Sequence, residues 1–108
     1  MNKQDRKYLK RLLETPSPTG CEQRIASVVR ERMEGVADQV TTDVMGSVHA
    51  RLVGRGEAPS LMLAAHMDEI GFMVKKIEED GRLRVCNVGW NWTASAYNTR
   101  VVFRNGVY

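Results

Sequence analysis

A histidine and two acidic residues follow directly after an uninterrupted apolar run. The run covers residues 61–65, and His66, Asp68 and Glu69 come next in the order His-x-Asp-Glu. An imidazole can bind a metal ion through one ring nitrogen while a nearby carboxylate accepts the proton on the other, which fixes the tautomer that binds. His66 is therefore the candidate metal ligand, and Asp68 is the candidate catalytic residue that orients it.

The same residues have a simpler interpretation, in which a histidine and an aspartate only end a strand and open a turn. The apolar run before His66 helps to choose between a functional site and a plain turn. A short apolar run bounded by turn residues is typical of a strand buried on both faces, and ligands in α/β proteins bind just beyond the carboxyl ends of such strands. We therefore expect residues 61–65 to form a buried strand that presents His66 at its end.

Two amphipathic helices are predicted ahead of this strand. The first covers residues 3–14 and ends before Pro16, and the second runs from about residue 22 to about residue 34. Their apolar side chains recur at helical spacing and are Tyr8, Leu9, Leu12 and Leu13 in the first helix and Ile25, Val28, Val29 and Met33 in the second. Ser17 or Thr19 is expected to cap the second helix by accepting hydrogen bonds from its exposed amides.

A β-hairpin is predicted between the second helix and the apolar run. Residues 36–43 and 47–53 are its strands, and Met45-Gly46 permits the turn between them. The second histidine of the chain, His49, falls on the polar face of the alternating second strand. We interpret His49 as a solvated strand residue rather than as a metal ligand.

Further strands are predicted after the His-x-Asp segment. Residues 72–77 alternate, and residues 79–81 supply a tight reversal into a strand at residues 82–88. Residues 100–103 form another candidate strand, and Asn105-Gly106 is a strong hairpin signal after it. We expect these strands to begin a second, all-β unit. Its unpaired edge near the last residue would pair with another copy of the chain, meet a missing segment, or fray.

Composition excludes some classes of protein. With 43% hydrophobic and 27% charged residues, the 108-residue chain has no apolar stretch near the ~18 residues that span a bilayer, and its first residues lack the apolar core of a secretion signal. We therefore expect a cytoplasmic location, no membrane partner, and reduced thiols at Cys21 and Cys86. The net charge of +3 comes from scattered basic residues, and aromatic residues are few, which argues against nucleic acid as a partner.

Three stretches together suggest a family. They read Ser-Pro-Thr-Gly at residues 17–20 with Glu22 just beyond, Asp-Val-Met-Gly at residues 43–46, and Ala-His-Met-Asp-Glu-Ile-Gly-Phe at residues 65–72. In order and spacing these stretches resemble the N-terminal portion of the glutamyl aminopeptidase family of dinuclear metallopeptidases. Its members are also called deblocking or tetrahedral aminopeptidases, and often cellulase M.

This resemblance implies an α/β fold. Residues 1–70 would be the N-terminal part of a zinc-peptidase-like αβα domain, and residues 71–108 would be the first strands of a β-barrel dimerisation domain. It also implies a metal-dependent aminopeptidase that hydrolyses N-terminal residues from peptides with two divalent metal ions, zinc or cobalt. His66 would be the first metal ligand and Asp68 its orienting partner, and the enzyme would be a homo-oligomer.

The length of the chain limits these expectations. A catalytic zinc usually takes three protein ligands plus water, and the resemblance puts the remaining ligands and the general base in sequence beyond these 108 residues. We therefore expect an incomplete metal site and an inactive isolated chain. The alternative is a noncatalytic interaction or assembly module derived from the same family. A domain of this size is expected to bury about 60 to 65% of its unfolded surface.

Overall fold

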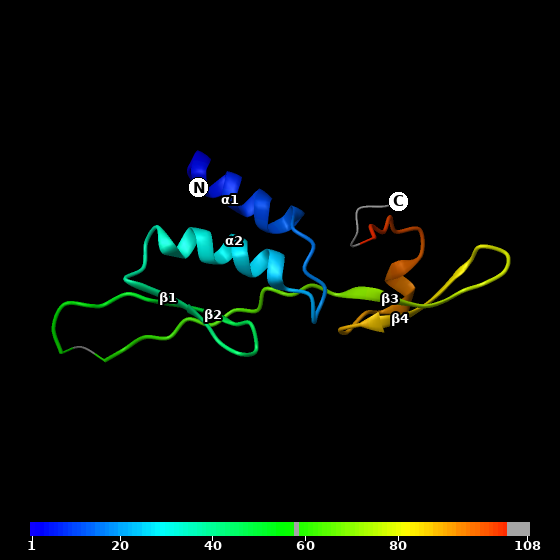
Figure 1. Ribbon diagram of the computed structural model, residues 1–108. Coiled ribbons are helices and arrows are strands. Elements are labelled where there is room, and N and C mark those ends of the chain that lie inside the picture. Colours follow the sequence, from blue (N-terminus) through cyan, green and yellow to red (C-terminus); the bar gives the residue numbers. More distant parts are fainter. Residues whose placement is uncertain (58, 104–108) are drawn as a thin grey trace.

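The computed structural model describes residues 1–57 and 59–103, which form two helices and two separate two-stranded antiparallel sheets (Figure 1). The predicted mixed α/β class is thus confirmed. In chain order, the elements are α1 Lys3–Glu14, α2 Gln23–Glu34, β1 Gln39–Thr42, β2 Val48–Arg51, β3 Gly71–Ile77, β4 Leu83–Val88 and the 3-10 helix η1 Thr93–Ala96.

Helix α1 has the bounds that its apolar spacing predicted. It begins after Asn2, whose Oδ1 accepts a hydrogen bond from the backbone amide of Asp5 at 2.8 Å, and Pro16 lies two residues beyond its end. Ion pairs join α1 to α2: Arg11 to Glu31 at 2.6 Å, and Arg32 to Asp5 at 3.2 Å. Because the groups of both pairs are at least partly exposed to solvent, these contacts orient the helices more than they stabilise them.

Helix α2 lies between α1 and the β1–β2 hairpin (Figure 1) and carries the small core. Ile25 and Val28 are the buried apolar side chains of the described residues, and both come from the predicted stripe. The predicted cap is wrong. In the described part of the chain Glu22 precedes the helix without a side-chain capping hydrogen bond, while Ser17 and Thr19 contact a distant segment instead.

The β1–β2 hairpin is shorter than predicted but has the predicted turn. Asp43 Oδ1 accepts hydrogen bonds from the backbone amides of Met45 and Ser47, both at 2.9 Å, and Gly46 adopts a left-handed φ of +91°. His49 is exposed on β2, as predicted, and its Nε2 lies 3.1 Å from Asp43 Oδ2. The side chain of His49 therefore reinforces the turn.

The buried strand predicted at residues 61–65 is wrong. In the described part of the chain these residues belong to no sheet, and Leu61, Met62 and Leu63 are 84%, 86% and 87% exposed. A strand needs neighbours for its backbone hydrogen bonds, and the two hairpins on either side of this segment each pair only within themselves. Its apolar composition indicates burial, but the described residues supply nothing to bury it.

The β3–β4 hairpin follows, with the predicted reversal at residues 79–81. The amide of Glu78 donates to the carbonyl of Arg82 at 2.8 Å, and Gly81 takes a left-handed φ of +84°. Residues 100–103 lie in no described strand, so that strand prediction is wrong. The predicted turn at Asn105-Gly106 and the edge beyond it lie outside the described residues.

The chain is open rather than tightly packed. A compact protein of 12.2 kDa exposes about 6,100 Å², whereas this chain exposes 9904 Å². The radius of gyration is 18.1 Å, against about 13 Å for a compact domain of this length. Relative to about 17,700 Å² for the unfolded chain, about 44% is buried. The expected 60 to 65% is therefore wrong, because the hairpins do not pack on each other.

Neither Cys21 nor Cys86 takes part in a disulfide bond among the described residues. No helix within residues 1–57 and 59–103 combines the length and the apolar character that crossing a bilayer requires.

Candidate functional site

The loop between the two helices runs alongside the segment that carries His66, Asp68 and Glu69. Pro18 forms an isolated parallel β-bridge with Glu69. Two backbone hydrogen bonds make this bridge: the Glu69 amide donates to the Ser17 carbonyl at 2.9 Å, and the Thr19 amide donates to the Glu69 carbonyl at 3.3 Å. Because a residue before proline favours extended backbone, the loop is suited to strand-like pairing.

The Glu69 side chain strengthens this bridge. Its Oε1 accepts a hydrogen bond from the backbone amide of Ser17 at 2.7 Å, and Ser17 is only 4% exposed. A buried amide without a partner would destabilise the loop, and an ionised acceptor makes the stronger kind of hydrogen bond. The Glu69 carboxylate therefore has a structural role in holding the loop.

His66 and Asp68 lie together. The Nδ1 atom of His66 is 3.1 Å from Asp68 Oδ1 and 3.0 Å from the Asp68 backbone carbonyl oxygen. A carbonyl oxygen only accepts hydrogen bonds, so both contacts require the proton on Nδ1. In the neutral ring the lone pair then lies on Nε2, and with the side chain 86% exposed that nitrogen is open to a ligand.

Thr19 completes this arrangement, although the sequence prediction gave it another role. Its Oγ1 donates a hydrogen bond to Asp68 Oδ2 at 2.7 Å. This hydrogen bond is the main cause that holds the pKa of the Asp68 carboxyl below its usual value, and the hydrogen bond from His66 adds to the effect. The available signal was the presence of Thr19 in the Ser-Pro-Thr-Gly stretch that resembles the family.

These donors fit part of a metal site. His66 offers one imidazole nitrogen, in the tautomer and with the carboxylate partner that metal-binding histidines commonly have. Within the described residues, no three side chains of His, Cys, Asp or Glu gather closely enough to hold a metal ion. His49 lies on the first hairpin with Asp43 as its partner, so the structure does not bring the two histidines into one cluster.

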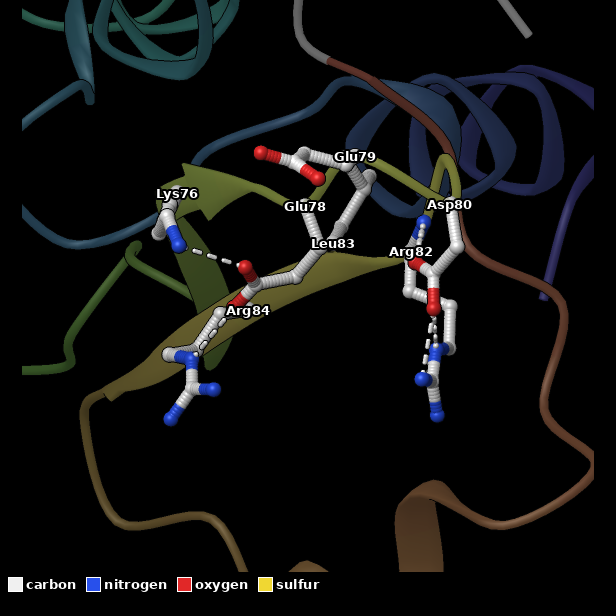
Figure 2. Close-up of a pocket in the computed structure, with 7 residues that line it drawn as sticks. All are labelled: Lys76, Glu78, Glu79, Asp80, Arg82, Leu83 and Arg84. Atoms are coloured by element: carbon white, nitrogen blue, oxygen red, sulfur yellow. Dashed lines mark hydrogen bonds and ion pairs between the residues drawn. The ribbon is translucent and has the colours of Figure 1, made fainter.

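A surface hollow of about 660 Å³ lies at the β3–β4 turn (Figure 2), and His66 is not among the residues that line it. Most of its charged side chains pair with one another. Glu78 accepts from Lys76 at 2.6 Å and from Arg84 at 2.9 Å, and Asp80 pairs with Arg82. The hydrogen bonds from Lys76 and Arg84 lower the pKa of the Glu78 carboxyl. Since most of these charges are already paired, we do not place the functional site there.

Comparison with known families shows which protein family the chain belongs to. The sequence model described as M42 glutamyl aminopeptidase matches residues 46–107, which is more than half of the chain and includes the His-x-Asp-Glu segment. The chain belongs to the M42 glutamyl aminopeptidase family. The predicted resemblance is thereby confirmed.

Curated relatives of this chain include two proteins named as aminopeptidases. A lysyl aminopeptidase of Pyrococcus furiosus is 42% identical over 86 residues, which are 79% of this chain and 24% of the relative. The glutamyl aminopeptidase of Lactococcus lactis is 38% identical over 85 residues, which are 77% of this chain and 24% of the relative. The chain thus spans about a quarter of the length of the curated relatives that it matches.

Solved structures agree with the M42 assignment. A TET aminopeptidase from a marine sediment archaeon, Thaumarchaeota archaeon, has a TM-score of 0.74 and 34% identity, over 82% of this chain and 25% of that one. A Thermotoga maritima protein named an endoglucanase has a TM-score of 0.69 and 39% identity, over 78% and 27% of the two chains. The described fold therefore corresponds to a part of these larger chains.

Proposed function

We propose that this M42 chain is part of a metal-dependent aminopeptidase that removes N-terminal residues from peptides. His66 binds a divalent cation through Nε2, and Asp68 holds the imidazole in the tautomer that binds. The observation that carries the proposal is the contact of His66 Nδ1 with two oxygens of Asp68, the carboxylate Oδ1 at 3.1 Å and the backbone carbonyl at 3.0 Å. Those contacts direct the proton to Nδ1 and leave Nε2 for the metal.

The divalent cations, two per site and either zinc or cobalt, supply Lewis-acid activation of water when they are bound. The residues of this chain hold and orient the His66 imidazole. Asp68 keeps the Nδ1 proton of His66 in place. The bridge between Pro18 and Glu69 fixes the backbone from which these side chains extend.

We also propose that the isolated chain has no peptidase activity, because a catalytic zinc usually takes three protein ligands plus water and His66 provides one. The other ligands would come from segments that the longer relatives have and this sequence does not include. Membership of a peptidase family favours a chain that belongs to an aminopeptidase over a noncatalytic assembly module.

Two structural parts are proposed within the chain. Residues 1–70 are part of the peptidase domain, and residues 71–108 begin a β-barrel insertion through which copies of the protein associate. In support, α1, α2 and the β1–β2 hairpin pack together, whereas β3 and β4 pack chiefly on each other. Association into a homo-oligomer would follow from this proposal, and we separately propose a cytoplasmic location.

The endoglucanase name of one structural neighbour does not lead us to propose a glycosidase. Such an enzyme needs two carboxyl groups that face each other across the sugar bond. Asp68 and Glu69 are adjacent in sequence, and each is engaged: Asp68 with Thr19 and His66, and Glu69 with the amide of Ser17. Their arrangement suits the positioning of one imidazole better than acid catalysis on a sugar.

Titration of the chain with Co²⁺, followed by NMR of the two histidine rings, tests the proposal. We expect the paramagnetic ion to broaden the His66 signals first, most strongly around Nε2, and the response to vanish in His66→Ala. His49→Ala is the matched control because His49 is also exposed and also contacts an aspartate. An equal cobalt response in wild type and His66→Ala would refute the assignment of His66 as a ligand.

A further inference from the structure

We propose that Thr19 is a positioning residue for the His66 imidazole. Acting through Asp68, the Thr19 hydroxyl fixes the carboxylate that holds the Nδ1 proton, and so sets the tautomer and the direction of Nε2. The purpose of this positioning rests on the proposed metal-binding function. The contacts that carry it are Thr19 Oγ1 to Asp68 Oδ2 at 2.7 Å and Asp68 Oδ1 to His66 Nδ1 at 3.1 Å.

The two oxygens of the Asp68 carboxylate have different partners. Oδ2 accepts from Thr19 and Oδ1 accepts from His66, so rotation of the carboxylate would break both hydrogen bonds. Without the hydroxyl, the carboxylate can turn toward water and the backbone carbonyl of Asp68 alone would retain the ring. Thr19 therefore supplies the constraint that makes the carboxylate a fixed acceptor.

Thr19 is itself held by the surrounding backbone. Its amide donates to the Glu69 carbonyl at 3.3 Å, and the next residue, Gly20, turns the chain with a left-handed φ of +85°. The end of β4 also approaches Thr19. A Cβ added to Gly89, the residue after β4, would lie 3.7 Å from Thr19 Oγ1, so Gly89 lies close to the hydroxyl.

The chemistry of threonine suits this task. Its branched Cβ restricts χ1 to fewer rotamers than serine has, which keeps the hydroxyl aimed at Asp68 with a smaller entropy loss. Valine has the same shape without the hydrogen-bond donor. Thr19→Val therefore removes the proposed interaction with little change in packing, and Thr19→Ser restores the donor.

The test is long-range ¹H–¹⁵N NMR of the His66 ring in the full chain, at a pH where the imidazole is neutral, with His49→Ala used to assign the signals. We expect wild type and Thr19→Ser to show the Nδ1–H tautomer, and Thr19→Val to shift the population toward Nε2–H. Thr41→Val is the matched control because Thr41 is an exposed residue of β1, outside the loop and the His-x-Asp segment. Cobalt affinity should fall about tenfold in Thr19→Val, since loss of such a supporting partner commonly costs that much.

An unchanged tautomer in Thr19→Val would overturn the proposal. If that variant loses its fold, Thr19→Ser and Thr19→Ala decide: equal tautomer populations in these two would also overturn it. A tautomer shift in the absence of any cobalt binding would leave the positioning role of Thr19 intact and reject the proposed metal-binding function. The two proposals therefore fail on different measurements.

Discussion

Ser17 and Glu69 are joined by a 2.7 Å hydrogen bond from a buried backbone amide to a carboxylate, across 52 positions of the sequence. This bond and the backbone bridge beside it connect the loop after α1 to the segment that carries His66. The geometry of the candidate site therefore depends on a contact made outside any helix or sheet.

Replacing Glu69 should loosen this connection. Glu69→Ala leaves the buried Ser17 amide without its side-chain acceptor, at a cost of about 1 to 3 kcal/mol, whereas Glu69→Gln keeps an acceptor oxygen and should cost less. Hydrogen exchange of the Ser17 amide measures the difference, and roughly tenfold or greater acceleration is expected in Glu69→Ala. Equal protection in wild type and both variants would show that the carboxylate does not hold the loop.

The β1–β2 turn should weaken in acid. Hydrogen bonds from His49, and then from the Ser47 amide, lower the pKa of Asp43 in the folded chain. Since this pKa lies below the unfolded value of about 3.9, the stabilisation is fully present above that value and is lost as the pH falls through the folded pKa. NMR shifts of the Met45 and Ser47 amides should follow this loss, and Asp43→Asn should remove the transition. Persistence of the transition in Asp43→Asn would assign it to another group.

The exposed apolar segment should make the chain associate. Met62 and Met45 are both 86% exposed, but only Met62 lies in the apolar run at residues 61–65. Met62→Lys should therefore lower concentration-dependent light scattering, and Met45→Lys, which adds the same charge, should lower it much less. Equal effects would indicate that net charge, rather than this segment, controls association.

Substitution of Gly89, the residue after β4, should disturb the packing around Ile70 and Thr19. Gly89 has a φ of +74°, and an added Cβ would lie 3.3 Å from Cγ2 of Ile70. Gly46 has a similar φ of +91° with nothing within 4 Å of such a Cβ, so both alanine variants should lose about 1 kcal/mol from backbone strain. Only Gly89→Ala should also shift the methyl NMR signals of Ile70 and Thr19. Unchanged signals in Gly89→Ala would show that the contact relaxes locally.

The local elements could be predicted from the sequence because local rules govern them. The apolar spacing and Pro16 define α1, and the glycines at 46 and 81 mark the reversals of the β1–β2 and β3–β4 hairpins. Residues 61–65 were predicted incorrectly because an apolar run indicates burial without showing whether neighbouring strands are present.

The site was predicted only in part. The His66–Asp68 contact follows from a spacing of two residues, so the sequence could indicate it. The contact between Thr19 and Asp68 joins positions 49 apart, and a capping role in the adjacent helix accounts equally well for a hydroxyl at position 19. Local patterns could not distinguish those two uses of the same side chain.

The bridge from the first loop to Glu69 also sets an order of folding. Closing a loop of this length costs about 3.5 kcal/mol of chain entropy before any native contact forms, whereas α1, α2 and the first hairpin need only nearby residues. During synthesis the early elements can form while the His-x-Asp segment is still inside the ribosome. Alignment of the imidazole must then be a late event, after residue 69 has emerged from the exit tunnel.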